Sequence, residues 1–72
     1  MTKEQIQKHV ERRPFIPFKV RLAGGELIDV PSPDHAHLHP TGRTLFVHLD
    51  DGGTDIMDVA LVMDVKERAS FV

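Results

Sequence analysis

The sequence predicts an α+β fold in which one N-terminal helix precedes five short antiparallel strands that curl into a small barrel. Three observations lead to this prediction. Residues 2–13 carry apolar side chains at helical spacing, whereas most segments from residue 18 onward alternate between apolar and polar side chains. Turns rich in glycine or proline separate these segments at short intervals. The chain has 72 residues, the size of one domain. We therefore expect a single domain spanning 1–72, with the helix at 2–13 and the barrel at 18–68.

The expected helix begins at Thr2, which fits the N-cap of a capping box with Gln5 three residues later. Ile6 and Val10 lie four residues apart and therefore share one face of the helix. Pro14 disfavours helical geometry at the residue before it, so the helix should end there.

The first two strands are expected at 18–22 and 26–30, joined by the loop 23–25. A loop of three residues keeps the apolar side chains of both strands on one face and places Lys19 opposite Asp29 on the other. A loop of two residues would mix charged side chains into the apolar face. We therefore expect the three-residue loop.

Residues 35–39 alternate again, and 44–49 is the strongest strand of the chain. With a four-residue turn at 40–43, these two segments pair with their apolar side chains on one face. The turn signal at 50–53 then leads into a strand at 54–57. Continuing the register through that turn places Val47 opposite Ile56 and His48 opposite Asp55.

The last strand is expected at 63–67. The compact step from Met57 to Met63 suits a single helical turn, as in SH3-like and Sm-like barrels. Strands of this length hide their apolar faces by curling around one another, so an SH3-like or Sm-like barrel is the predicted architecture.

The composition excludes several classes of site and location. The chain has no cysteine, which excludes disulfides and cysteine-ligated zinc. Lys and Arg number 9 and Asp and Glu number 11, giving a net charge of -2, whereas nucleic-acid-binding proteins usually carry a basic excess. No apolar run approaches the ~20 residues needed to span a bilayer. The N-terminal segment also lacks the apolar core of a signal peptide. We expect a cytoplasmic protein with no membrane partner.

Several short motifs occur in a fixed order along the chain. Residues 13–18 read Arg-Pro-Phe-Ile-Pro-Phe, and the later features are Leu22, Gly25, Val30-Pro31, Pro40-Thr41-Gly42-Arg43 and Asp51-Gly52-Gly53. In these features nearly the whole chain resembles a group of short uncharacterised bacterial proteins with an Arg-Pro-Phe-x-Pro-Phe start. The resemblance implies a shared fold and a bacterial origin, and it carries no assigned activity.

The order of a helix followed by five strands is also similar to that of Sm-like RNA-binding proteins. Asp34 matches an Asp that those proteins carry near their second and third strands. His37 stands where they carry Asn, and Asp58 stands where they carry a basic residue or glycine. The resemblance implies an RNA- or DNA-binding module as one alternative function, with changed contact residues.

The histidines are the most unusual feature of the sequence. His35, His37 and His39 alternate, so in a strand they share one face. The expected registers place His35, His48 and Asp55 in one row across three strands, with His37 as a diagonal neighbour. Opposed residues have Cβ atoms about 4.5–5.5 Å apart, which allows imidazole and carboxylate groups to reach one ion. The hypothesis is a surface site for zinc, nickel or copper at His35, His37, His48 and Asp55, or a pH sensor. The alternative is an ordinary polar outer face.

Neither serine of the chain, Ser32 or Ser70, lies in a recognisable nucleophile motif. The acidic turn at 50–53 lacks the ligand spacing of a calcium loop. Gly24-Gly25 is followed by neither the Lys-Ser/Thr pair nor the helix start of a phosphate loop. We therefore predict that the protein is not an enzyme, and the leading prediction involves no cofactor.

Two surfaces could bind a partner. Basic side chains near the helix end and on the first strand could form a local nucleic-acid-binding patch, comprising Arg12, Arg13, Lys19, Arg21 and Arg43. An outward-facing Phe46 could stack on a base nearby. Apolar side chains also exceed what so small a core needs, and they include Phe15, Ile16, Phe46, Met57 and Phe71-Val72. The leading prediction is a non-catalytic interaction or regulatory module that self-associates or binds another protein, with Phe46 and Met57 at the interface.

Overall fold

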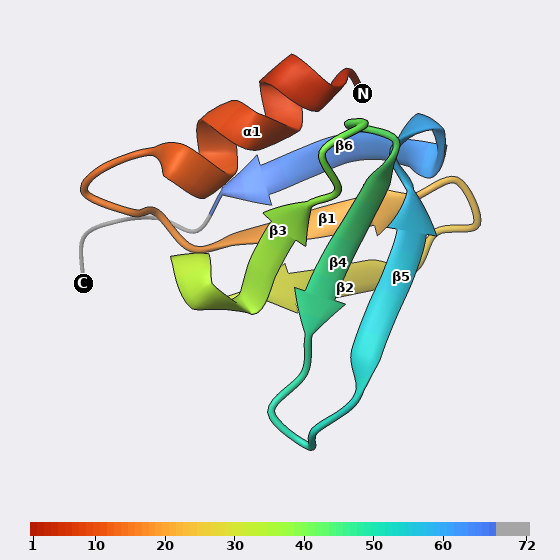
Figure 1. The fold of residues 1–72 in the computed structure, drawn as a ribbon. Helices are drawn as coiled ribbons and strands as arrows, with labels where there is room; N and C mark the ends of the chain where they lie inside the picture. Colours follow the sequence, from red (N-terminus) through yellow and green to blue (C-terminus); the bar gives the residue numbers. More distant parts are fainter. Residues whose placement is uncertain (68–72) are drawn as a thin grey trace.

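The computed structural model describes residues 1–67 and shows one helix, six strands and two 3-10 turns (Figure 1). The elements are α1 (Lys3–Glu11), β1 (Phe18–Leu22), β2 (Leu27–Val30), η1 (Pro33–His35), β3 (Ala36–Leu38), β4 (Thr44–His48), β5 (Thr54–Asp58), η2 (Val59–Leu61) and β6 (Val62–Glu67). The strands form two three-stranded antiparallel sheets with the orders β2-β1-β6 and β3-β4-β5. The predicted α+β class is confirmed.

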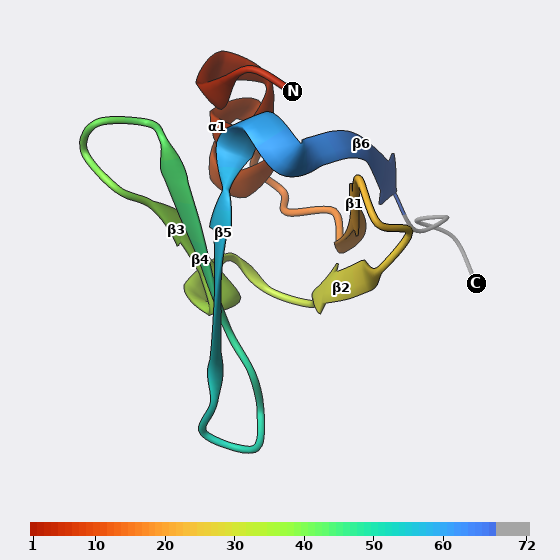
Figure 2. The ribbon, with the colours of Figure 1, turned by 90° about the vertical axis from the view of Figure 1, so that its right-hand side faces the viewer.

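The predicted closed five-strand barrel is wrong, because residues 1–67 contain six strands rather than five, and these form two separate sheets (Figure 2). The chain crosses from one sheet to the other after β2 and again at η2. Pro31 and Pro33 have no backbone N–H to donate, so the hydrogen-bond ladder stops between β2 and β3. The predicted helical turn between Met57 and Met63 is confirmed by η2.

The capping box at the start of α1 is present as predicted. Gln5 donates its backbone N–H to Thr2 Oγ1 over 3.2 Å, and Thr2 donates its own to Gln5 Oε1 over 2.9 Å. The helix ends at Glu11, two residues earlier than expected. Its one buried side chain is Ile6, which has no exposed surface.

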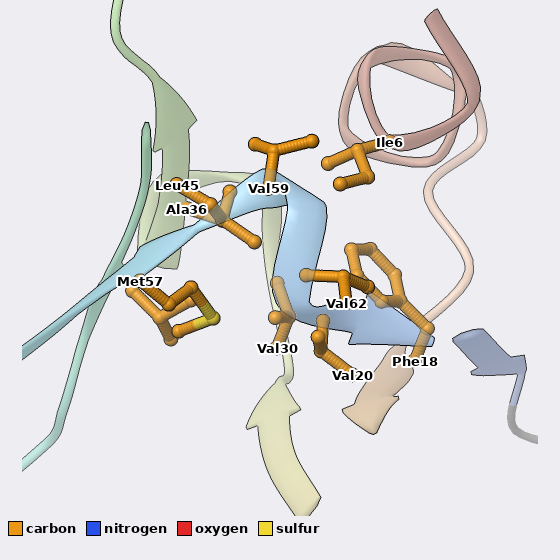
Figure 3. Packing of buried hydrophobic residues seen from close by; sticks show 10 residues of the cluster. Ile6, Phe18, Val20, Val30, Ala36, Leu45, Met57, Val59 and Val62 are labelled. Atoms are coloured by element: carbon orange, nitrogen blue, oxygen red, sulfur yellow. The ribbon is translucent and has the colours of Figure 1, made fainter. Parts of the chain in front are cut away.

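The core fills the space between the two sheets and α1 (Figure 3). Its buried members are Ile6, Phe18, Val20, Val30, Ala36, Leu45, Val47, Met57, Val59 and Val62. Phe15 also packs against this core, with its ring 5.8 Å from that of Phe18, so it is not a free surface side chain. The apolar residues Phe71 and Val72, and the predicted end of the barrel at residue 68, lie outside the described residues.

Two of the three predicted hairpin registers are confirmed. In the first hairpin Phe18 lies opposite Val30, and Lys19 lies opposite Asp29. Its loop has three residues, closed by the hydrogen bond from Leu22 N to Glu26 O at 2.9 Å. In the β3–β4 pair the predicted partners of Ala36, His37 and Leu38 are found, including His37 opposite Phe46. The predicted pair of His35 with His48 is not formed, because His35 lies in η1.

The predicted register of the third hairpin is wrong by one residue. Val47 lies opposite Asp55 instead of Ile56, and His48 lies opposite Thr54 instead of Asp55. The loop has three residues, because Leu49 N donates to Gly53 O at 2.8 Å. The third residue of that loop has a φ of 93°, a value that glycine adopts without strain.

A shift of one residue turns every side chain of a strand to the opposite face. Met57 therefore points into the core, with 7% of its surface exposed, and Ile56 points outward with 66% exposed. The expectation that Met57 belongs to an exposed interface is wrong for this reason. Among residues 1–67, no helix is long and apolar enough to cross a membrane.

Candidate interaction surface

The outer side of the β3-β4-β5 sheet carries a row of large side chains across all three strands. His37 lies opposite Phe46, and Phe46 lies opposite Ile56 on its other side. His48 follows two residues after Phe46 on the same side of β4. We call His37, Phe46, His48 and Ile56 the aromatic face. The predicted outward orientation of Phe46 is confirmed by this register, although its side chain is half-buried.

The rings of the aromatic face stack on one another. The centroids of His37 and Phe46 are 4.8 Å apart with 18° between the planes. The centroids of His37 and His48 are 5.1 Å apart with 28° between the planes. His48 Nδ1 also lies 3.2 Å from the Thr54 hydroxyl, at hydrogen-bond distance. Stacking and this contact fix the ring orientations, so the face offers a partner a preformed platform.

Ile56 is the most exposed large apolar side chain in the described part of the chain, at 66%. It is a direct neighbour of Phe46 across the strands. An apolar side chain that is exposed beside a half-buried aromatic ring forms a continuous patch rather than a scattered surface residue. Such a patch favours contact with another macromolecule.

The outer side of the other sheet has a different character, because its charges are paired. Lys19 lies 3.8 Å from Asp29, and Arg21 lies 3.1 Å from Asp64. These pairs join neighbouring strands and are open to water, so each contributes little to stability. They also neutralise the cations that the sequence analysis assigned to a basic patch.

The remaining cations of the predicted basic patch are not gathered with Lys19 and Arg21. Arg12 Nη1 is bound to Glu67 Oε1 at 2.7 Å. Arg13 donates to the backbone carbonyls of Val10 and Arg12. Arg43 lies in the turn between β3 and β4, in the other sheet. The five residues therefore do not form one contiguous positive surface.

The four residues of the predicted metal site are also not brought together. His35 lies in η1 rather than in a strand, and its ring is directed toward Asp50. His37 and His48 lie on the aromatic face. Asp55 occupies the opposite side of the sheet, as a consequence of the corrected register. Across residues 1–67, no three histidine, aspartate or glutamate side chains are placed to hold one ion.

Ser32, His35 and Asp50 form a contact that the sequence patterns did not predict. Ser32 Oγ lies 2.7 Å from His35 Nδ1, and His35 Nε2 lies 2.9 Å from Asp50 Oδ1. The order of groups is that of a catalytic triad, but the side chain of Asp50 is 89% exposed, whereas a triad aspartate is buried. We interpret the contact as a clip that joins η1 to the β4–β5 loop. The sequence contained one signal for η1. Proline is favoured at the first position of a helix, and Pro33 directly follows Ser32, so the segment before His35 favours a helical turn over a strand.

A groove of about 660 Å³ opens between β2 and the β4–β5 hairpin. Its apolar lining includes Leu27 and Leu49, which are 53% and 36% exposed. Charged residues of both signs surround it, including Asp55 and Lys66. Because these charges do not favour one sign of ligand, the groove offers a weaker signal than the aromatic face.

Comparison with models of protein families, with curated proteins and with solved structures finds no match to this chain. Function must therefore be inferred from the residues themselves.

Proposed function

We propose that this domain is a non-catalytic interaction module that self-associates through the aromatic face. The observation that carries the proposal is the 66% exposure of Ile56 beside Phe46 on an otherwise regular sheet. Burying an isoleucine side chain completely is worth about 1.5–3 kcal/mol, so covering the exposed part of Ile56 contributes about 1–2 kcal/mol in each copy. Two copies that cover this position together gain twice that amount.

The distribution of charge supports this choice of face. The outer side of the β2-β1-β6 sheet is occupied by ion pairs, which would have to be desolvated on burial. The aromatic face itself carries no carboxylate or ammonium group. Burial of this face therefore avoids the larger desolvation penalty.

The proposal is tested by measuring mass against protein concentration by light scattering after size exclusion. We expect the wild-type mass to rise with concentration and the Ile56→Lys variant to stay monomeric. The matched control is Met63→Lys, because Met63 is 61% exposed and lies in β6 of the other sheet. This control should associate like the wild type. A monomer at every concentration, or equal loss in both variants, would contradict the proposal.

A second candidate function is nucleic-acid binding, favoured by the stacking of the exposed His37 ring between the half-buried Phe46 and the exposed His48. Bases stack on aromatic side chains at about 1–3 kcal/mol each. The test is fluorescence anisotropy of labelled single-stranded oligonucleotides at several salt concentrations. Affinity that falls as salt rises, and that is lost in Phe46→Leu, would support this function. The pairing of Arg12, Lys19 and Arg21 with carboxylates favours self-association instead.

A further inference from the structure

Two three-stranded sheets have four outer edges, and these edges differ in how open they are. The residues that flank α1 contact both ends of β6. The Met1 amino group donates a hydrogen bond to Val62 O, and Arg12 Nη1 donates one to Glu67 Oε1. The β3 strand has only three residues, and β2 borders the groove. β5 has five residues and lies at the margin of the molecule in Figure 1, with no other helix or strand of residues 1–67 along its outer side.

The backbone of β5 presents an ordered set of free groups at this edge. Leu49 bonds to Gly53 and Val59 bonds to Arg43, in the same register as the β4–β5 ladder. In an antiparallel ladder the bonded pairs alternate with non-bonded pairs. The residues between the bonded positions therefore direct their N–H and C=O groups away from β4, and they are Thr54, Ile56 and Asp58.

We propose that two copies of this chain pair through β5, antiparallel about a two-fold axis at Ile56, to form one six-stranded sheet. This inference rests on the proposed self-association and specifies how it occurs. The free N–H and C=O of Ile56 in each copy bond to those of Ile56 in the other. Thr54 of one copy lies opposite Asp58 of the other. The two Ile56 side chains then lie beside each other and cover one another, which is the contact between aromatic faces that the proposed self-association requires. His37, Phe46 and His48 of both copies stay on the outer side of the six-stranded sheet.

The charges of β5 favour this register over its neighbours. With Ile56 at the axis, Asp55 lies opposite Met57 of the second copy and Asp58 lies opposite Thr54. Because only Thr54, Ile56 and Asp58 direct their free groups outward, the neighbouring registers differ by two residues. A shift of two residues in one direction would place Asp55 against Asp55, and in the other direction it would place Ile56 against Asp58. Like charges directly opposed destabilise a strand pair. The register centred on Ile56 also uses all five residues of both strands, whereas any shift shortens the ladder.

Edge strands in soluble proteins are commonly protected by lysine or proline, or by a covering element. β5 contains neither lysine nor proline, and its two charges, Asp55 and Asp58, flank the apolar pair Ile56-Met57. In the two-fold pairing the Thr54 hydroxyl of one copy can donate to the Asp58 carboxylate of the other, at each end of the central Ile56 pair. The strand is thus complementary to itself in both backbone and side-chain chemistry.

Disulfide trapping tests the register directly, because the chain has no cysteine of its own. In a bonded antiparallel pair the Cα atoms are about 5.5 Å apart, which lies within the range of a disulfide. The Ile56→Cys variant should therefore cross-link to itself under mild oxidation. Thr54→Cys alone and Asp58→Cys alone should not cross-link. In each of these dimers the two identical thiols lie four strand residues apart, at a distance of about 14 Å. A mixture of these two variants should cross-link.

Pairing holds the thiols at an effective concentration far above the bulk value, so we expect Ile56→Cys to cross-link about tenfold faster than Thr54→Cys or more. Met63→Cys serves as an exposed control outside the interface. Circular dichroism of each reduced variant checks that it is folded. Asp58→Cys needs this check most, because Asp58 Oδ1 accepts the Ala60 N–H at the start of η2.

The cross-linking results distinguish β5 pairing from self-association in general. A concentration-dependent wild-type dimer in which the mixture of Thr54→Cys and Asp58→Cys, which keeps Ile56, cross-links no faster than Met63→Cys overturns β5 pairing and leaves self-association intact. Cross-links between Ile56→Cys and Met63→Cys in an oligomer larger than a dimer also overturn it, because they indicate head-to-tail pairing of β5 with β6. A wild-type monomer with no accelerated cross-linking overturns both ideas together.

Discussion

Replacing Ile56 or Met57 with threonine tests the register of the third hairpin. Threonine keeps β-branching and favours strands, so strand propensity changes little at either position. Met57 is 7% exposed in the core, whereas Ile56 is 66% exposed. Truncating a buried methionine costs about 2–5 kcal/mol, and an unpaired buried hydroxyl adds about 1–3 kcal/mol. We expect Met57→Thr to lose about 3 kcal/mol or more of unfolding free energy and Ile56→Thr to lose about 1 kcal/mol or less.

The loss is large relative to the whole stability of the domain. At about 0.05–0.15 kcal/mol per residue, a chain of this length has roughly 4–11 kcal/mol. For its size, a loss of 3 kcal/mol lowers Tm by roughly 12–24 °C. The assay is urea or thermal unfolding by circular dichroism, at a concentration where the wild type is monomeric, since association would stabilise the fold. Equal losses, or a larger loss at Ile56, would refute the register with Met57 inside.

Three further measurements examine other parts of the structure. Gly52→Ala should lower the free energy of unfolding, measured by urea denaturation, by about 1–2 kcal/mol because φ is 93° there, whereas Gly53→Ala should lower it less; the reverse order would point to a different loop. Thr2→Ala removes the helix cap and should cost about 1 kcal/mol in the same assay, and no change would show that α1 frays without consequence. His35→Ala removes two hydrogen bonds and should lower the free energy of unfolding by about 1–2 kcal/mol. Asp50→Asn keeps a hydrogen-bond acceptor, so its free energy of unfolding should stay near that of the wild type. A larger effect at Asp50 than at His35 would argue against the clip.

The elements with local signals could be predicted from sequence. The capping box located the start of α1, because the reciprocal hydrogen bonds of Thr2 and Gln5 involve only neighbouring residues. The first hairpin followed from charge, because only the three-residue loop keeps Lys19 and Asp29 on the side away from the core. In both cases the alternative conformation carried an evident penalty within a few residues.

The third hairpin lacked such a penalty. Ile56 and Met57 are adjacent and both apolar, so alternation does not indicate which of them faces inward. The segment 50–53 also supplies glycines for either a three-residue or a four-residue loop. The choice is made by packing, because Met57 fills the core beside Leu45. That contact depends on the whole fold and is not encoded within the hairpin.

The barrel prediction failed for a related reason. The prolines at 31 and 33 marked a break, but a break does not specify the direction in which the chain continues. After η1 the chain places Ala36 inward and begins a second sheet, and the Ser32–His35–Asp50 clip joins the turn to the far hairpin. This nonlocal contact turned His35 out of the row that the metal hypothesis required.

One residue of register connects the metal hypothesis with the interaction surface. If Asp55 lay opposite His48, Ile56 would face the core opposite Val47, and one row of the outer face would pair His48 with Asp55 as an ion site requires. In the observed register Asp55 faces inward and Ile56 joins Phe46 outside. The two functions are therefore mutually exclusive for this hairpin, because the adjacent residues Asp55 and Ile56 point to opposite faces of the strand. A strand that exposes isoleucine at an open edge is suited to binding a partner strand rather than a metal ion. Unfolding of Ile56→Thr and Met57→Thr tests the register, and the register decides between the two hypotheses.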